Sequence, residues 1–204
     1  MSKITKIETQ KNKSRVNIFV DDSFFCGLNK ETAIIYGLKE SLEINEEKLR
    51  RALFESEVKS AFEKALDYLS RRMYSKKELF DKLTQKGFAK EVVQQAIEKL
   101  ENYHYVDDRL FAKQFVQSNQ KLSKRILTGK LFQKGVSNDI IDEILEERTD
   151  DEEYELCLIQ AKKYLKSKEV LTLNDLKKMQ ANLARKGFGF DNINKVCRKL
   201  VSVD

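Results

Sequence analysis

The residues that could carry out chemistry in this chain are few, and the strongest pair is Asp107-Asp108. Two adjacent carboxylates just ahead of a basic segment could hold Mg²⁺ in a nuclease. One of them could instead cap a helix that starts at Arg109, because a carboxylate accepts hydrogen bonds from the free amide groups of a helix N-terminus. Capping is the better interpretation, since an isolated adjacent pair rarely supplies enough ligands for a metal ion.

The histidine and cysteine content gives little support for catalysis. His104 is the single histidine, and its place between two tyrosines favours packing between helices over a role as general base. Cys26, Cys157 and Cys197 lie far apart in the sequence and form no Cys-x-x-Cys motif. We therefore expect buried reduced thiols, no bound metal and no cofactor.

The dipeptide Gly129-Lys130 is similar to the end of a phosphate-binding loop. That motif requires Ser or Thr at the next position and a glycine five positions before Gly129. The chain has Leu131 and Lys124 there, so the motif is absent. No set of nucleophile, base and orienting group remains, and we predict that the protein is not an enzyme.

The elements that position these residues are predicted to be mainly helices. The chain has 204 residues, of which 41% are apolar and 35% charged, a composition typical of a folded protein with a heavily solvated surface. It contains no proline, so helices can run almost throughout. No window approaches about twenty consecutive apolar residues, and the N-terminus lacks the apolar stretch of a signal peptide. We expect a cytoplasmic protein.

The first thirty or so residues are predicted to form a small sheet. Alternating apolar residues from Ser14 to Leu28, interrupted by a turn at 21–23, indicate a hairpin, and a strand at Ile4–Thr9 should join it. Asn29 is then expected to cap a short helix. Asn45 should open a longer helix.

The remainder of the chain repeats itself. The strings LTQKGF, LFQKGV and LARKGF contain Gly87, Gly135 and Gly187, each preceded by a leucine and followed by an apolar residue. This pattern is typical of a helix closed by a glycine in the left-handed conformation. A second amphipathic helix follows each glycine. A further amphipathic helix comes before the glycine-closed helix of each unit, at about 61–72, 110–119 and 154–166.

The sequence therefore predicts a mainly α fold with three tandem three-helix repeats in an extended array and a small N-terminal sheet. The expected long helix opened by Asn45 runs to about Arg72. We predict four domains, with limits at 1–54, 55–105, 106–150 and 151–204.

Charge is distributed unevenly over these repeats. The net charge is +6. Between Arg109 and Asn138 there is no acidic residue, whereas Asp139–Glu155 has ten carboxylates and a single basic residue, Arg148. The second repeat has seven basic residues, Arg109, Lys113, Lys121, Lys124, Arg125, Lys130 and Lys134. The first has Arg71, Arg72, Lys76, Lys77, Lys82, Lys86 and Lys90, and the third has Lys162, Lys163, Lys166, Lys168, Lys177 and Lys178.

These basic groups could line a stripe that follows a phosphate backbone or an acidic protein groove. Each group alone is also compatible with an ordinary solvated helix face, but the acid-free length of the second favours a function. We expect contacts to a partner or DNA from Arg71, Arg72, Lys76, Lys77, Lys113, Lys121, Lys124, Arg125, Lys130, Lys134, Lys162 and Lys163.

The ordered combination of motifs resembles the RecX family of regulatory proteins. The segment YLSRRMYSKKELFDKLTQKGF, followed by YVDDRLFAKQF and KLFQKGV, carries the resemblance, which is strong over 61–136, weaker in the third repeat and thin before Arg50. The matching residues are Ser75, Glu78, Leu79, Lys82, Leu83, Lys86, Gly87, Asp107, Asp108, Phe111, Ala112, Leu131, Lys134 and Gly135. The second repeat departs from the family pattern, with Ser123-Lys124 in place of Gly-Pro and Lys130 in place of Glu.

The resemblance implies a monomeric, non-enzymatic protein that binds the filament of the RecA recombinase on DNA. It implies inhibition of the recombinase ATPase and strand exchange, and thus modulation of DNA repair and recombination. The expected partners are that filament and the single- or double-stranded DNA within it, with no membrane. The residues alone leave two alternatives open, a stand-alone helical DNA-binding protein and the magnesium-dependent nuclease.

Overall fold

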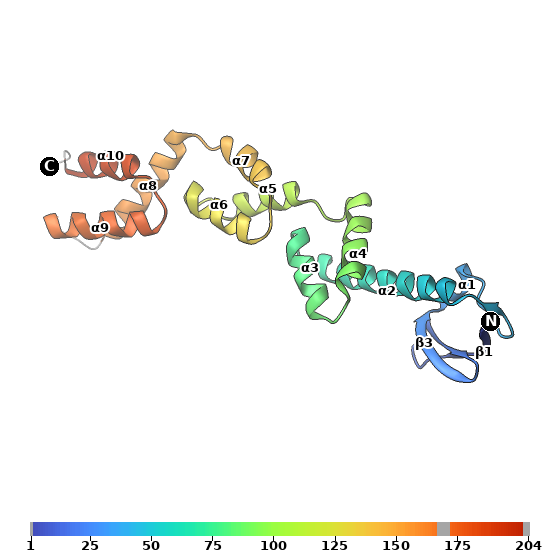
Figure 1. Cartoon of the computed structure of the whole chain (residues 1–204). Coiled ribbons are helices and arrows are strands. Elements are labelled where there is room, and N and C mark those ends of the chain that lie inside the picture. The colour runs from blue at the N-terminus through green and yellow to red at the C-terminus, as the bar shows by residue number, and fades with distance from the viewer. Residues whose placement is uncertain (1, 167–171, 202–204) are drawn as a thin grey trace. The chain divides into compact units, whose positions relative to one another are not determined.

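The computed structural model describes residues 2–166 and 172–201, so Lys168 lies outside the described residues. The chain divides into two compact units, Met1–Val106 and Asp107–Asp204. Figure 1 shows a sheet at the N-terminal end followed by helices. No helix in the described ranges is both long and apolar enough to cross a bilayer.

The first unit begins with a four-stranded antiparallel sheet in the order β3-β2-β1-β4. Its strands are β1 (Ser2–Thr9), β2 (Arg15–Val20), β3 (Ser23–Asn29) and β4 (Glu43–Ile44). The predicted hairpin is confirmed, and its turn residues Asp21 and Asp22 have φ values of 47° and 62°. Positive φ at both central residues is the feature of the type I′ turn, whose twist matches that of the flanking strands. Strand β4 has only two residues, too few to give an alternating pattern, and it was not predicted from the sequence.

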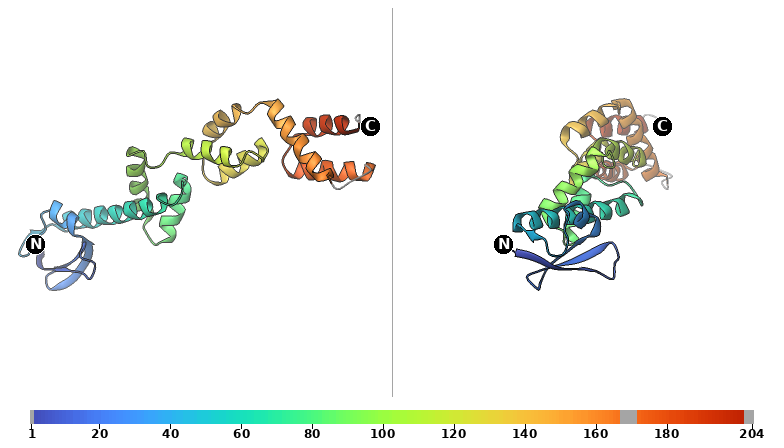
Figure 2. Two further views of the ribbon diagram at one scale, coloured as in Figure 1. Left: turned by 180° about the vertical axis from the view of Figure 1, so that it is seen from behind. Right: turned by 90° about the vertical axis from the view of Figure 1, so that its right-hand side faces the viewer.

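The sheet packs against the N-terminal half of α2 (Glu46–Leu69), and both lie together in the two views of Figure 2. Asn45 caps this helix as predicted, because its side chain accepts a hydrogen bond from the Glu47 amide at 2.8 Å. Asn29 occupies the N-cap position of the preceding short helix, as predicted, but it makes no side-chain capping bond. The buried Asn29 amide group donates instead to the Ser56 carbonyl of α2 at 3.0 Å, and its side chain does not cap α1 (Lys30–Ile35).

The rest of the chain forms three-helix domains, each with a core of leucine, isoleucine, valine and alanine. In the first, the C-terminal half of α2, which ends before the predicted Arg72, packs with α3 (Lys76–Gln85) and α4 (Lys90–Asn102). The second unit has α5 (Asp108–Ser118), α6 (Lys124–Gln133), α7 (Asn138–Glu146), α8 (Asp150–Leu165), α9 (Leu173–Arg185) and α10 (Phe190–Val201). The predicted mainly helical fold with three three-helix repeats and an N-terminal sheet is confirmed, and the exact domain limits stay a prediction.

The three repeated glycines close α3, α6 and α9. Gly87, Gly135 and Gly187 have φ values of 96°, 82° and 83°. In each turn the glycine amide donates to the carbonyl three residues back, and the next amide donates to the carbonyl of the repeated leucine. This pair of bonds satisfies carbonyls that the helix end leaves free, and it reverses the chain so that the next helix packs back.

Gly187 has a second constraint, which comes from the preceding three-helix domain. A Cβ atom at this glycine would lie 2.6 Å from Ser123 Oγ and 2.9 Å from Ile126 Cγ1. The Ser123 hydroxyl also donates to the Lys186 carbonyl at 2.7 Å. The turn after α9 therefore lies directly against the N-terminus of α6, whereas a Cβ at Gly87 would meet no atom within 4 Å.

We predict that Gly187→Ala destabilises the protein more than Gly87→Ala does. Both changes place a side chain at positive φ, at a cost of about 1–3 kcal/mol. Gly187→Ala adds a steric clash worth about 1–3 kcal/mol in a packed contact. Urea unfolding followed by circular dichroism measures the difference, and equal destabilisation by the two variants would contradict the contact between α6 and the turn after α9.

Candidate nucleic-acid interface

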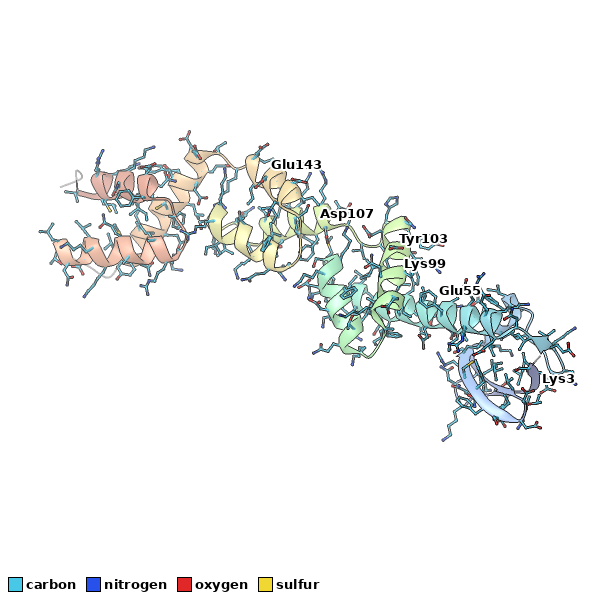
Figure 3. The ribbon with its side chains drawn as sticks, in the orientation of Figure 1. Lys3, Glu55, Lys99, Tyr103, Asp107 and Glu143 are labelled. Carbon is cyan, nitrogen blue, oxygen red and sulfur yellow. The ribbon has the colours of Figure 1, made fainter. Side chains whose placement is uncertain are left out.

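One member of the carboxylate pair that suggested a metal site caps a helix. Asp107 stands at the start of α5 (Figure 3), and its side chain accepts hydrogen bonds from the amides of Arg109 and Leu110 at 2.7 and 3.1 Å. Asp108 is buried in the first turn. Among the described residues, no three His, Cys, Asp or Glu side chains cluster in a way that could hold a metal ion.

We predict that Asp107→Ala lowers the free energy of unfolding by about 1 kcal/mol, because two amides lose their acceptor. Asp107→Asn should stay within about a few tenths of a kcal/mol of the unchanged protein, since asparagine caps as well as aspartate. Thermal unfolding checks both variants. Magnesium-dependent DNA cleavage that disappears in Asp107→Asn would overturn the capping role in favour of the nuclease alternative.

His104 does not pack between helices, so that prediction is wrong. The residue is exposed, has a φ of 57° and follows the last turn of α4. The His104 backbone amide donates to the Glu101 carbonyl, and the Tyr105 backbone amide donates to the Leu100 carbonyl. Both N···O distances are 2.8 Å. His104 thus occupies the left-handed position that glycine occupies after α3, α6 and α9.

The thiols have no feature of reactive cysteines. Burial and the nearby Glu57 carboxylate raise the pKa of Cys26 to about 11. Burial, together with Glu153 and Cys197, raises the pKa of Cys157 to about 12. Burial also raises the pKa of Cys197. The thiolate is the nucleophilic form, so these side chains stay protonated and unreactive at neutral pH.

The basic residues of the first repeat are paired with carboxylates of their own unit. Arg71 pairs with Asp67 at 3.3 Å and Arg72 with Glu78 at 3.2 Å, and Arg72 also stacks on the Tyr74 ring. The amino groups of the other two predicted contact residues are likewise near carboxylates: Lys76–Glu101 at 2.8 Å and Lys77–Asp81 at 3.6 Å. The positive charge of these four residues is therefore largely compensated by carboxylates within the chain itself.

The basic residues of the second repeat are arranged differently. Five predicted contact residues make no ion pair within the described part of the chain: Lys113, Lys121, Lys124, Arg125 and Lys130. Lys134 lies over the rings of Phe111 and Phe115, at 5.7 and 5.5 Å from their centroids. Arg109, by contrast, pairs with Glu143, which Figure 3 labels on α7. The structure therefore concentrates uncompensated positive charge on and beside α6.

In the third repeat, Lys162 and Lys163 lie exposed in the last turn of α8. Neither makes an ion pair in the described ranges. Cations there are favourable because the helix C-terminus is the negative end of the dipole. The two lysines thus have a local electrostatic role in addition to any contact with a partner.

An ion pair that is largely buried holds the N-terminus of α6, and it was not predicted from the sequence. Arg148 Nε lies 3.2 Å from Glu153, and the two side chains are only 14% and 9% exposed. Arg148 also donates to the Leu122 carbonyl at 2.6 Å, and Glu153 accepts from the Lys124 amide at 3.1 Å. That amide is available because residue 124 is lysine, whereas a proline at this position would lack the N–H group. A lone arginine within a run of ten carboxylates was the available signal.

We predict that Glu153→Gln destabilises the second unit by up to about 3 kcal/mol, because Arg148 becomes a buried cation without its counterion. The exposed Glu155, on the same helix, provides the matched control: Glu155→Gln should change the free energy of unfolding by less than about 0.5 kcal/mol. Denaturant unfolding measures both. Equal stabilities of the two variants would show that the buried pair contributes nothing.

Comparison with known proteins identifies the same domains. Family models match residues 2–45 as the N-terminal domain of the regulatory protein RecX, and 61–100, 107–145 and 150–197 as the first, second and third RecX three-helix domains. Regulatory protein RecX of Clostridioides difficile strain 630 is 36% identical, over 100% of this chain and 98% of its own length. The chain belongs to the RecX family.

Further RecX relatives show the same similarity. Regulatory protein RecX of Bacillus licheniformis is 35% identical over 95% of this chain and 76% of its own length. A crystal structure of a regulatory protein RecX superposes with a TM-score of 0.74 at 26% identity, covering 96% of this chain and 98% of that one. The structure of RecX from Lactobacillus salivarius covers 71% of this chain and 96% of its own, with a TM-score of 0.63 at 24% identity, and shows the shared fold. The RecX resemblance thus extends to the sheet and the third repeat, where the motifs were weakest.

Proposed function

We propose that this RecX chain is a non-enzymatic regulator that binds the RecA filament on DNA and inhibits its ATPase and strand exchange, thereby modulating DNA repair and recombination. The observation that carries the proposal is the uncompensated positive charge on and beside α6. A surface with cations and no carboxylate partners attracts an anionic polymer, and release of condensed counterions from nucleic acid adds to the affinity. Family membership supplies the recombinase as the partner.

The proposed mechanism requires no chemistry by the regulator. If the chain binds one conformation of the filament more tightly than another, it shifts the filament toward that conformation by the difference in affinity. Contacts from several three-helix domains to successive parts of a filament would add by avidity. The carboxylates and thiols described above support this mechanism because they have structural roles.

The test measures RecA ATPase on single-stranded DNA while this protein is titrated in. We expect inhibition by the unchanged protein, and a rise of more than about tenfold in the half-inhibitory concentration for the triple variant Lys121→Glu, Arg125→Glu, Lys130→Glu. Glutamate is favourable at position 125 in the first turn of α6 and unfavourable at position 130 in its last turn, and Lys121 precedes the helix. The two effects oppose each other, so we expect little change in helix content, which circular dichroism checks.

The matched control is Lys11→Glu, Lys13→Glu, Lys39→Glu, which reverses three exposed lysines of the N-terminal sheet region and reaches the same net charge. It should inhibit like the unchanged protein. Retained inhibition by the α6 variant, or equal loss in both, would reject α6 as the contact surface. Tight, salt-sensitive binding to duplex DNA without any effect on the recombinase would favour the stand-alone DNA-binding alternative.

A further inference from the structure

One side of α6 faces solvent with an unusual set of residues. Leu127 and Leu131 are fully buried on the opposite side of this helix. Arg125, Gly129 and Phe132 follow each other at spacings of four and three residues, are all exposed, and therefore share the solvent side. We call these three residues the α6 outer face.

Gly129 has no structural reason to be glycine within this chain. It lies in the middle of the helix, where glycine destabilises relative to alanine. It is not among the glycines with positive φ, and a Cβ atom built on it would meet no atom within 4 Å. The missing side chain leaves the helix backbone uncovered at the centre of the outer face, so that a partner could approach it closely.

Phe132 is 63% exposed, one helical turn after this glycine. Arg125, the cation on this face, makes no ion pair with the described residues, and neither does Lys121, which precedes the helix. An open aromatic ring beside unpaired cations is the combination with which proteins bind single-stranded nucleic acid, because bases stack on the ring and phosphates pair with the cations. Duplex DNA offers phosphates but keeps the faces of its bases stacked.

We propose that the α6 outer face binds a single strand of nucleic acid directly, with the sugar–phosphate backbone against Gly129 and a base stacked on Phe132. This inference deepens the proposed function and rests on it for the presence of nucleic acid in the assembly. An acidic protein surface would also satisfy the cations. It does not account for the aromatic ring, so the nucleic acid is favoured.

The experiment is fluorescence anisotropy of a labelled oligothymidylate with the full chain, in the absence of recombinase. Gly129→Ala should weaken binding about tenfold, because a methyl group enters a packed contact, yet the melting temperature should stay the same or rise. Phe132→Leu should weaken binding about tenfold, since it keeps an apolar side chain but loses stacking, and Phe132→Trp should retain binding.

Two matched controls separate the outer face from general surface effects. Gly189→Ala adds a methyl group to another glycine with no atom within 4 Å of the added Cβ, and Ile159→Ala removes an apolar side chain that is 58% exposed. Both lie in the same unit as α6, and both should bind oligothymidylate like the unchanged protein. Circular dichroism reports whether any variant is unfolded.

The outcomes of this proposal and of the regulator proposal can be told apart. Absence of oligothymidylate binding, or binding that is indifferent to Gly129→Ala and Phe132→Leu, overturns the strand contact even if the recombinase is inhibited. Duplex binding that is as tight and as sensitive to both variants also overturns it. Strand binding that shows the expected sensitivities supports it even if recombinase ATPase is unaffected, which would reject only the regulator function.

Discussion

A left-handed residue after a helix end determines how each three-helix domain closes. The hydrogen bonds of this turn reverse the chain within two residues, so the apolar sides of consecutive helices face each other without a long loop. Gly87, Gly135 and Gly187 provide it after the middle helix of each domain. Without this reversal, the buried leucines Leu83, Leu131 and Leu183 would have no helix to pack against.

The same domains differ in how they treat charge. In the first, arginines and lysines lie beside carboxylates of the same domain, which reduces the electrostatic field that they present to solvent. In the second, the carboxylates lie at the start of α5 and on α7, and the buried Glu153 of α8 binds Arg148 and a backbone amide at the start of α6. Both domains are rich in basic residues. The surface available to an anionic partner is therefore the one whose basic residues are not already paired with carboxylates of the chain.

The fold could be predicted further than the site. Helix-closing glycines and apolar spacing depend on neighbours a few residues away, so the helices after α2 and the hairpin were correctly predicted. The hydrogen bond of the Asn29 side chain was not predicted, because its partner Ser56 lies in another element. His104 was mispredicted because residues other than glycine adopt positive φ only uncommonly, so its place after a helix end did not indicate a turn as the repeated glycines did. The pairing of Lys76 with Glu101 and the hydrogen bond from Arg148 to the Leu122 carbonyl likewise join residues of different elements, which a charge count along the sequence does not contain.

The 24-residue helix α2 belongs to two cores at once. Leu49 and Ala52 complete the core of the sheet, while Ala65 is part of the core of the first three-helix domain. Unfolding of the sheet or of the first three-helix domain removes packing contacts from the same helix α2, so loss of order in one destabilises the other. The N-terminal sheet thus cannot be treated as a detachable appendage, and a boundary placed inside α2 for truncation or domain exchange would expose a cut apolar surface on both pieces.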